Sequence, residues 1–187
     1  MNIAAAKEQH VPASRKIEAA LLALLKTKPY NSISVSELAE AAGVSRQSFY
    51  LSFENKEAVL HGLFVRLFGD IMVEVDSSGI ASMDGLVRKY TDIVEKHAEI
   101  FKLLADNDLG PLLSRVFVGE FVKRAPVLKI QKIPANEDER LYINSFWVSA
   151  FIDVYTAWLK NGMITGKDEL NRILTDIMTG NYFKQRI

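Results

Sequence analysis

A helical spacing of apolar residues runs through nearly the whole 187-residue chain, and this pattern limits the fold to packed helices. Within residues 17–25 the apolar side chains recur at three- and four-residue intervals, which places them on one face of a helix. The sequence has no convincing alternating run bounded by hairpin turns, the pattern typical of paired β-strands. We therefore predict an all-α protein, built as one ordinary domain or as a small module joined to a larger one.

Composition narrows the classes of function. Hydrophobic residues make up 49% of the chain and charged residues 25%, which is enough apolar surface for a substantial core. The 23 Lys and Arg residues balance 23 Asp and Glu residues, so any role with nucleic acid has to be local. The absence of cysteine excludes a disulfide framework, a thiolate zinc site and a cysteine nucleophile, and three scattered histidines predict no metal site.

Residues 1–13 lack the apolar run of a signal peptide, and no stretch approaches the roughly 18 apolar residues of a membrane span. We expect a soluble, cytoplasmic protein without a membrane partner. Nine helices are predicted, at about 17–28, 34–43, 45–51, 55–75, 82–96, 97–106, 109–124, 136–161 and 166–179.

The second, third and fourth predicted helices carry start and stop signals. Ser34 followed by Glu37 three residues later forms a capping box, and Gly43 suits the left-handed turn that ends this helix. Ser45 and Asn55 are N-cap residues for the next two helices. Two short helices joined by a tight glycine turn predict a helix-turn-helix, whose second helix is presented to the DNA major groove.

Residues 14–64 resemble the DNA-binding domain of the tetracycline-repressor-like (TetR) transcriptional regulators. The resemblance rests on a leading amphipathic helix followed by a spaced set of residues: Ile33, Leu38, Ala39, Ala42-Gly43-Val44-Ser45, Phe49-Tyr50, Phe53, Lys56-Glu57 and Val59-Leu60. It implies a three-helix DNA-binding domain in residues 1–53, a connecting fourth helix at about 55–75, and an effector-binding and dimerisation domain in residues 54–187.

The same resemblance implies a set of DNA contacts. Arg46, Gln47 and Ser48 would read bases, and phosphates would be contacted by Ser34, Tyr50 and Lys56. The full predicted DNA-binding set is Ser34, Ser45, Arg46, Gln47, Ser48, Tyr50, Leu51, Ser52 and Lys56. The sequence departs from the family pattern at Leu51, Ser52 and Glu54, and residues 31–60 hold two cations against four carboxylates. We therefore expect sequence-specific binding that rests on a few placed groups, with a shallower dependence on salt than that of a strongly basic regulator.

The predicted helix at 136–161 is apolar nearly all round and must be covered on more than one side. Together with the final helix it predicts a four-helix bundle between two subunits. The candidate dimer residues are Tyr142, Phe146, Trp158, Leu170, Ile173, Leu174 and Ile177. Packing of both faces within a single subunit is the alternative.

A pocket for a small effector is a further implication of the resemblance. The candidate lining residues are Leu86, Tyr90, Phe101, Leu104, Phe117, Phe121, Trp147, Phe151 and Tyr155. The same side chains would equally serve as plain core. Charged residues on these helices are assigned to a solvated face: Arg88, Lys89, Arg115, Lys123 and Arg124.

The sequence contains no phosphate loop, nucleophile elbow or His-Glu metal motif, so neither an enzyme nor a cofactor is predicted. By resemblance, we expect a homodimeric repressor that binds a near-palindromic, double-stranded operator and is released by a small-molecule effector of unknown identity. The alternative is a dimeric interaction module or co-regulator that keeps the fold but has lost or weakened operator binding.

Overall fold

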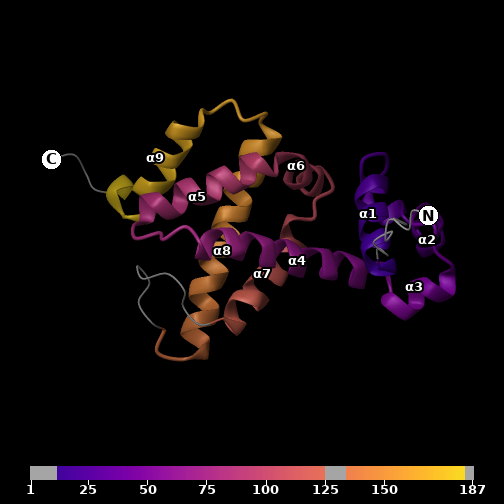
Figure 1. Ribbon diagram of the computed structural model, residues 1–187. Helices are drawn as coiled ribbons and strands as arrows, with labels where there is room; N and C mark the ends of the chain where they lie inside the picture. Colours follow the sequence, from indigo (N-terminus) through magenta and orange to yellow (C-terminus); the bar gives the residue numbers. More distant parts are fainter. Residues whose placement is uncertain (1–11, 125–133, 184–187) are drawn as a thin grey trace, which may run out of the picture. The chain divides into compact units, whose positions relative to one another are not determined.

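The computed structural model describes residues 12–124 and 134–183, and every regular element in these ranges is a helix (Figure 1). Residues 1–11, where the sequence predicts no leader, lie outside the described residues. The chain forms two compact units, Met1–Leu63 and Phe64–Ile187. The helices are α1 (Ala13–Leu25), η1 (Tyr30–Ser32), α2 (Val35–Ala41), α3 (Arg46–Ser52), α4 (Lys56–Asp76), α5 (Met83–Lys96), α6 (Ala98–Asp106), α7 (Gly110–Lys123), α8 (Glu137–Lys160), α9 (Lys167–Met178) and η2 (Asn181–Phe183).

The all-α prediction is confirmed for the described residues, as are nine α-helices close to their expected positions. The sequence missed the two short 3₁₀ segments, η1 and η2, because three residues are too few to show a periodicity. Within the described ranges, no helix is both long enough and apolar enough to cross a membrane.

In the first unit, α1, α2 and α3 pack around a small apolar core. Ile17 and Leu21 of α1, Leu38 of α2 and Phe49 of α3 are fully buried there. All three predicted caps are present. The Ser34 and Ser45 hydroxyls accept from the backbone N–H of the third helical residue, and the Asn55 Oδ1 accepts from the Ala58 N–H at 2.7 Å. These caps fix where α2, α3 and α4 begin.

The turn between α2 and α3 is a Schellman motif centred on Gly43. The Gly43 N–H donates to the Glu40 carbonyl at 2.9 Å, and the Val44 N–H donates to the Ala39 carbonyl at 3.0 Å. Gly43 has φ +64°, and a Cβ built there would meet no atom within 4 Å. Backbone conformation, and not space, is therefore what demands glycine at this turn.

We predict that Gly43→Val lowers the free energy of unfolding of the protein by about 1–2 kcal/mol, because a β-branched residue tolerates positive φ poorly. Gly43→Asn is the matched control. It adds a side chain of similar size but tolerates the left-handed region, so it is expected to lose clearly less. Urea unfolding of both variants measures the difference, and equal losses would show that space, not φ, limits this position.

The second unit is arranged around α8, the longest helix of the described chain. Helix α8 packs against α7 and α6, and α5 packs against α9 (Figure 1). Asn136 caps α8, since its Oδ1 accepts a hydrogen bond from the Glu139 N–H at 2.8 Å. One apolar cluster joins α5, α8 and α9 and consists of Val87, Val94, Tyr155, Trp158, Leu159, Leu170 and Leu174. Apolar residues around most of α8 are thus buried by different neighbours.

Candidate nucleic-acid interface and internal cavity

Helix α3 buries one face and exposes the other. Phe49 is fully buried, whereas Arg46 and Gln47 are exposed. Tyr50 is 52% exposed and meets the Phe49 ring edge-on at 5.5 Å, so its side chain is only partly packed against the unit. Leu51 is 83% exposed. The accessible face of α3 therefore offers one cation, one amide and one phenol.

The serines of α3 are largely occupied by the helix itself. The Ser45 hydroxyl accepts from the Ser48 N–H at 3.0 Å and lies 2.9 Å from the Ser48 hydroxyl. The Ser52 hydroxyl donates to the Ser48 carbonyl at 3.1 Å. In contrast, Arg46 and Gln47 form no hydrogen bond or ion pair within the described residues, so these two side chains are the ones free to reach a base edge.

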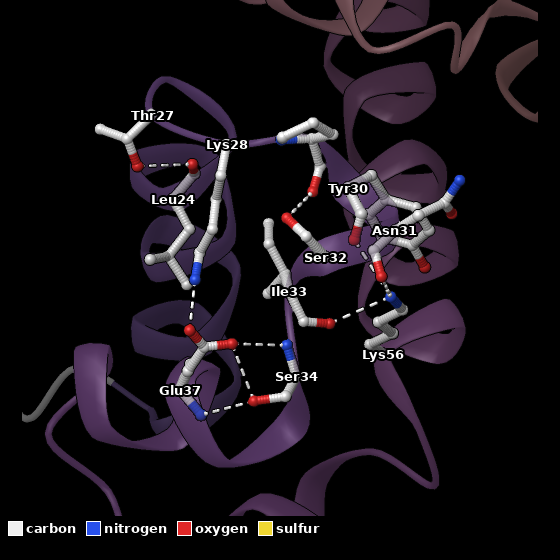
Figure 2. A network of polar contacts seen from close by, with 11 residues as sticks. Leu24, Thr27, Lys28, Tyr30, Asn31, Ser32, Ile33, Ser34, Glu37 and Lys56 are labelled. Atoms are coloured by element: carbon white, nitrogen blue, oxygen red, sulfur yellow. Dashed lines mark hydrogen bonds and ion pairs between the residues drawn. The ribbon is translucent and has the colours of Figure 1, made fainter.

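The capping box of α2 extends to a lysine of the preceding turn (Figure 2). The Ser34 N–H and hydroxyl both donate to Glu37 Oε2, at 2.9 and 2.8 Å, and Lys28 forms an ion pair with the other carboxylate oxygen. The bond from Lys28 and those from Ser34 lower the pKa of Glu37 to about 2. One of the four carboxylates in residues 31–60 is therefore already paired with a cation that lies before this segment.

Lys56 points into the first unit, although the sequence predicts that it contacts phosphate. Its ammonium donates to the carbonyls of Tyr30, Ile33 and Asn31, at 3.0, 3.0 and 3.4 Å (Figure 2). The same ammonium lies 4.5 Å from the centre of the Tyr30 ring. A lysine has three donors, and all three are engaged. In this structure Lys56 ties the start of α4 to the turn before α2.

We predict that Lys56→Met lowers the free energy of unfolding of the protein by about 1–3 kcal/mol, because the carbonyls lose their shared donor. Arg46→Met, which removes an exposed cation from the same unit, is the control and leaves stability within about 0.5 kcal/mol of the unsubstituted protein. Urea unfolding gives both values. A Lys56→Met protein as stable as the control would rule out this anchoring role.

The second unit contains a cavity of about 360 Å³. All nine residues that the sequence names as candidate lining do line this cavity: Leu86, Tyr90, Phe101, Leu104, Phe117, Phe121, Trp147, Phe151 and Tyr155. Trp147, Phe151 and Tyr155 lie one turn apart on α8 and stack at centroid distances of 6.4 and 5.9 Å. The volume falls within the range of small-molecule sites.

Three charged side chains also line the cavity. Arg124 and Asp76 form an ion pair at 2.7 Å, so Arg124 does not belong to the solvated face to which the sequence assigns it. The third is Arg140, in the first turns of α8, which is not among the lining residues predicted from the sequence. Its position three and seven residues before Ile143 and Trp147 is the signal that places it on the same helical face.

A buried hydrogen-bond chain leads from the cavity wall to α9. The Tyr155 and Thr91 hydroxyls lie 2.8 Å apart, and the Thr91 hydroxyl donates to the Asn171 Oδ1 at 2.5 Å. Thr91 and Asn171 are fully buried, and burial raises the pKa of Tyr155, so this phenol stays neutral. The chain connects a cavity residue of α8 to α5 and α9.

The candidate dimer residues divide into two groups. Trp158, Leu170 and Leu174 belong to the core of the second unit and have little surface left for a partner. In contrast, Tyr142 is 69% exposed, Phe146 is 66% exposed, and Ile177 is 39% exposed. Ile173 is partly buried. Among the described residues, no group of three or more His, Asp and Glu side chains is arranged to hold a metal ion.

Two family models match the chain. The model described as "Bacterial regulatory proteins, tetR family" matches residues 17–63, and that described as "Transcriptional regulator C-terminal region" matches residues 83–180. An exposed second helix of a helix-turn-helix, followed by a helical C-terminal region of this type, defines a transcriptional regulator. The chain belongs to the TetR family of these regulators.

Curated relatives match part of the chain. The HTH-type transcriptional regulator EthR of Mycolicibacterium smegmatis is 35% identical over 94 residues, which are 48% of this chain and 42% of that protein. The EthR protein of Mycobacterium tuberculosis (strain H37Rv) is 39% identical over 79 residues, 36% of this chain and 37% of that protein. The matched part is thus about two fifths of the length of these relatives.

Solved structures share the fold over most of their length. The fatty acid degradation regulator FadR from Bacillus halodurans superposes with a TM-score of 0.60 at 16% identity, covering 90% of this chain and 97% of that chain. A TetR transcriptional regulator from Streptococcus agalactiae gives 0.59 at 20% identity, covering 88% and 92%. At these identities the likeness concerns the fold alone.

Proposed function

We propose that this regulator binds a near-palindromic operator as a cytoplasmic homodimer, represses transcription there, and releases the DNA when a small molecule enters the cavity of the second unit. The exposed face of α3 carries this proposal. Arg46 and Gln47 are free of internal partners, and their base-reading chemistry matches guanine and adenine edges. The N-cap Ser45 and the buried Phe49 hold α3, which carries Arg46 and Gln47, in place.

Phosphate contacts in this proposal are few. Tyr50 keeps its predicted role because about half of the residue is exposed. Lys56, by contrast, acts indirectly by holding the start of α4, since its donors are occupied. Ser34 is exposed, but its hydroxyl and N–H already serve the capping box. Specificity then rests mainly on α3 and on the two copies of it that a dimer supplies.

We predict that Arg46→Ala costs about 1–3 kcal/mol in binding to the operator and narrows the difference between operator and unrelated DNA. Tyr50→Phe weakens binding to the operator and to unrelated DNA alike. It leaves the dependence of the binding constant on salt concentration unchanged, because the lost hydroxyl is uncharged. Mobility shifts across a salt series, on the DNA upstream of the protein's own coding sequence, measure these effects.

Lys102→Ala is the control for the DNA experiment, because it removes an exposed cation from α6 of the second unit. We expect it to bind as the unsubstituted protein does. A steep salt slope would contradict the small number of phosphate contacts, since each contributes about 0.9 to the slope. No shift on this DNA at any salt concentration would favour the interaction-module alternative.

We propose that the dimer forms through the exposed apolar side chains Tyr142 and Phe146 of α8 and Ile177 of α9. Exposed aromatic side chains are enriched at protein interfaces and costly to leave in water. The core residues Trp158, Leu170 and Leu174 would support these helices from within the subunit. Such an interface would place α8 and α9 of both copies together in one bundle.

We predict that Phe146→Asp converts the dimer to a monomer, because a carboxylate replaces an apolar contact at the interface. Val73→Asp is the matched control, since Val73 is 70% exposed on α4, outside the proposed interface. Light scattering after gel filtration gives the mass of each variant. A dimeric Phe146→Asp protein, or a Val73→Asp protein that is also monomeric, would move the interface elsewhere.

Helix α4 offers a direct connection for the ligand response. It carries Lys56 at its start, in the first unit, and Ile71, Met72 and Asp76 near its end, in the cavity wall of the second. We propose that α4 has two positions, one that allows operator binding and one that does not. The free protein samples both, and a bound ligand favours the second. The ligand would therefore change operator affinity by selecting a dimer geometry with a different spacing of the two α3 helices.

A further inference from the structure

We propose that the cavity of the second unit takes a monoanionic amphiphile, an apolar molecule with a single carboxylate, and that Arg140 binds the carboxylate. This inference rests on the proposed ligand response, because it names the chemical class of the effector. It begins from a buried donor of Arg140 that the protein itself does not use.

The guanidinium of Arg140 is half engaged. Its Nη1 donates to the Val122 carbonyl at 3.2 Å, which fixes the plane of the group. Its Nε is buried and has no hydrogen-bond partner. Within the described residues Nη2 likewise has no partner, and no carboxylate lies within ion-pair distance of the group. The edge formed by Nε and Nη2 is the side of an arginine that binds a carboxylate through two parallel hydrogen bonds.

An unpaired buried donor is costly, so the arrangement calls for a ligand acceptor. The charges of the cavity point to the sign of that acceptor. Asp76 and Arg124 neutralise each other in an ion pair, which leaves Arg140 as the one uncompensated charge among the described lining residues. A single negative charge on the ligand would balance it. A cationic head group would meet an unpaired arginine and is therefore disfavoured.

The rest of the cavity lining indicates that the remainder of the ligand is apolar. Apart from the three charged residues, the wall is mainly aliphatic and aromatic, with Trp147 and Phe151 following Arg140 along the same helix. An apolar chain or ring system therefore gains from leaving water, while its head group remains at the start of α8. A highly polar or polyanionic molecule would leave most of its polar groups without partners.

The test compares three probes of equal chain length that differ only in the head group: dodecanoate, dodecanol and dodecylammonium. Binding is measured by calorimetry and by the tryptophan fluorescence of the protein, to which Trp147 in the cavity wall and the core residue Trp158 contribute. With the unsubstituted protein we expect dodecanoate to bind about ten- to a hundredfold more tightly than dodecanol, as one charge-assisted pair implies. Dodecylammonium is expected to bind least well. Equal affinities for dodecanoate and dodecanol would overturn the inference without any substitution.

Variants then assign the preference to one residue. Arg140→Met is expected to abolish the preference for carboxylate while leaving dodecanol binding intact, which also shows that the cavity is still formed. Arg140→Lys keeps the charge but loses the two-donor edge, so part of the preference should remain. Lys123→Met is the matched control, because it removes a neighbouring exposed cation that does not line the cavity. A carboxylate preference that survives in Arg140→Met would overturn the assignment.

Operator release separates this inference from the proposed function. Dodecanoate that binds through Arg140 without altering the DNA mobility shift would contradict the proposed ligand response and leave the assignment of Arg140 standing. If dodecanol releases the operator as readily as dodecanoate does, the proposed ligand response is supported and the requirement for a carboxylate is overturned.

Discussion

The need to cover α8 shapes the second unit. Apolar side chains extend around most of this helix, so burying it requires neighbours on several sides, and α5, α6, α7 and α9 supply them. Two regions remain after that packing. One is the internal cavity beside Trp147 and Phe151, and the other is the exposed pair Tyr142 and Phe146. The proposed effector site and the proposed dimer interface are thus two consequences of one apolar helix.

The first unit is a small scaffold that holds a few exposed polar groups in defined positions. Its local caps and the Gly43 turn set the start and direction of each helix, and Lys56 ties α4 to the turn before α2. The ion pair between Lys28 and Glu37 also neutralises one of the carboxylates of residues 31–60. A chain with no net charge can therefore carry a DNA-reading surface, provided that the surface depends on placed groups and not on a broad field.

Much of the fold was predictable because its signals are local. Helical periodicity spans many residues, and the caps at Ser34, Ser45, Asn55 and Asn136 act within one turn. The cavity lining was also predictable, since large apolar residues on helices around one long helix converge on its face. The roles of individual charged residues were less predictable. Arg124 pairs with a residue 48 positions away, and that distance carries no sequence signal.

The helical fold, the helix-turn-helix and the family can be inferred from the amino-acid sequence, because periodicity, capping and a spaced motif are properties of neighbouring residues. How particular side chains are used depends instead on the tertiary structure. It directs Lys56 inward to backbone carbonyls, buries Trp158 in the core, and leaves the Nε of Arg140, a cavity-lining residue, without a partner. Long side chains find their partners in space across many residues of chain, so their roles follow from packing and not from spacing.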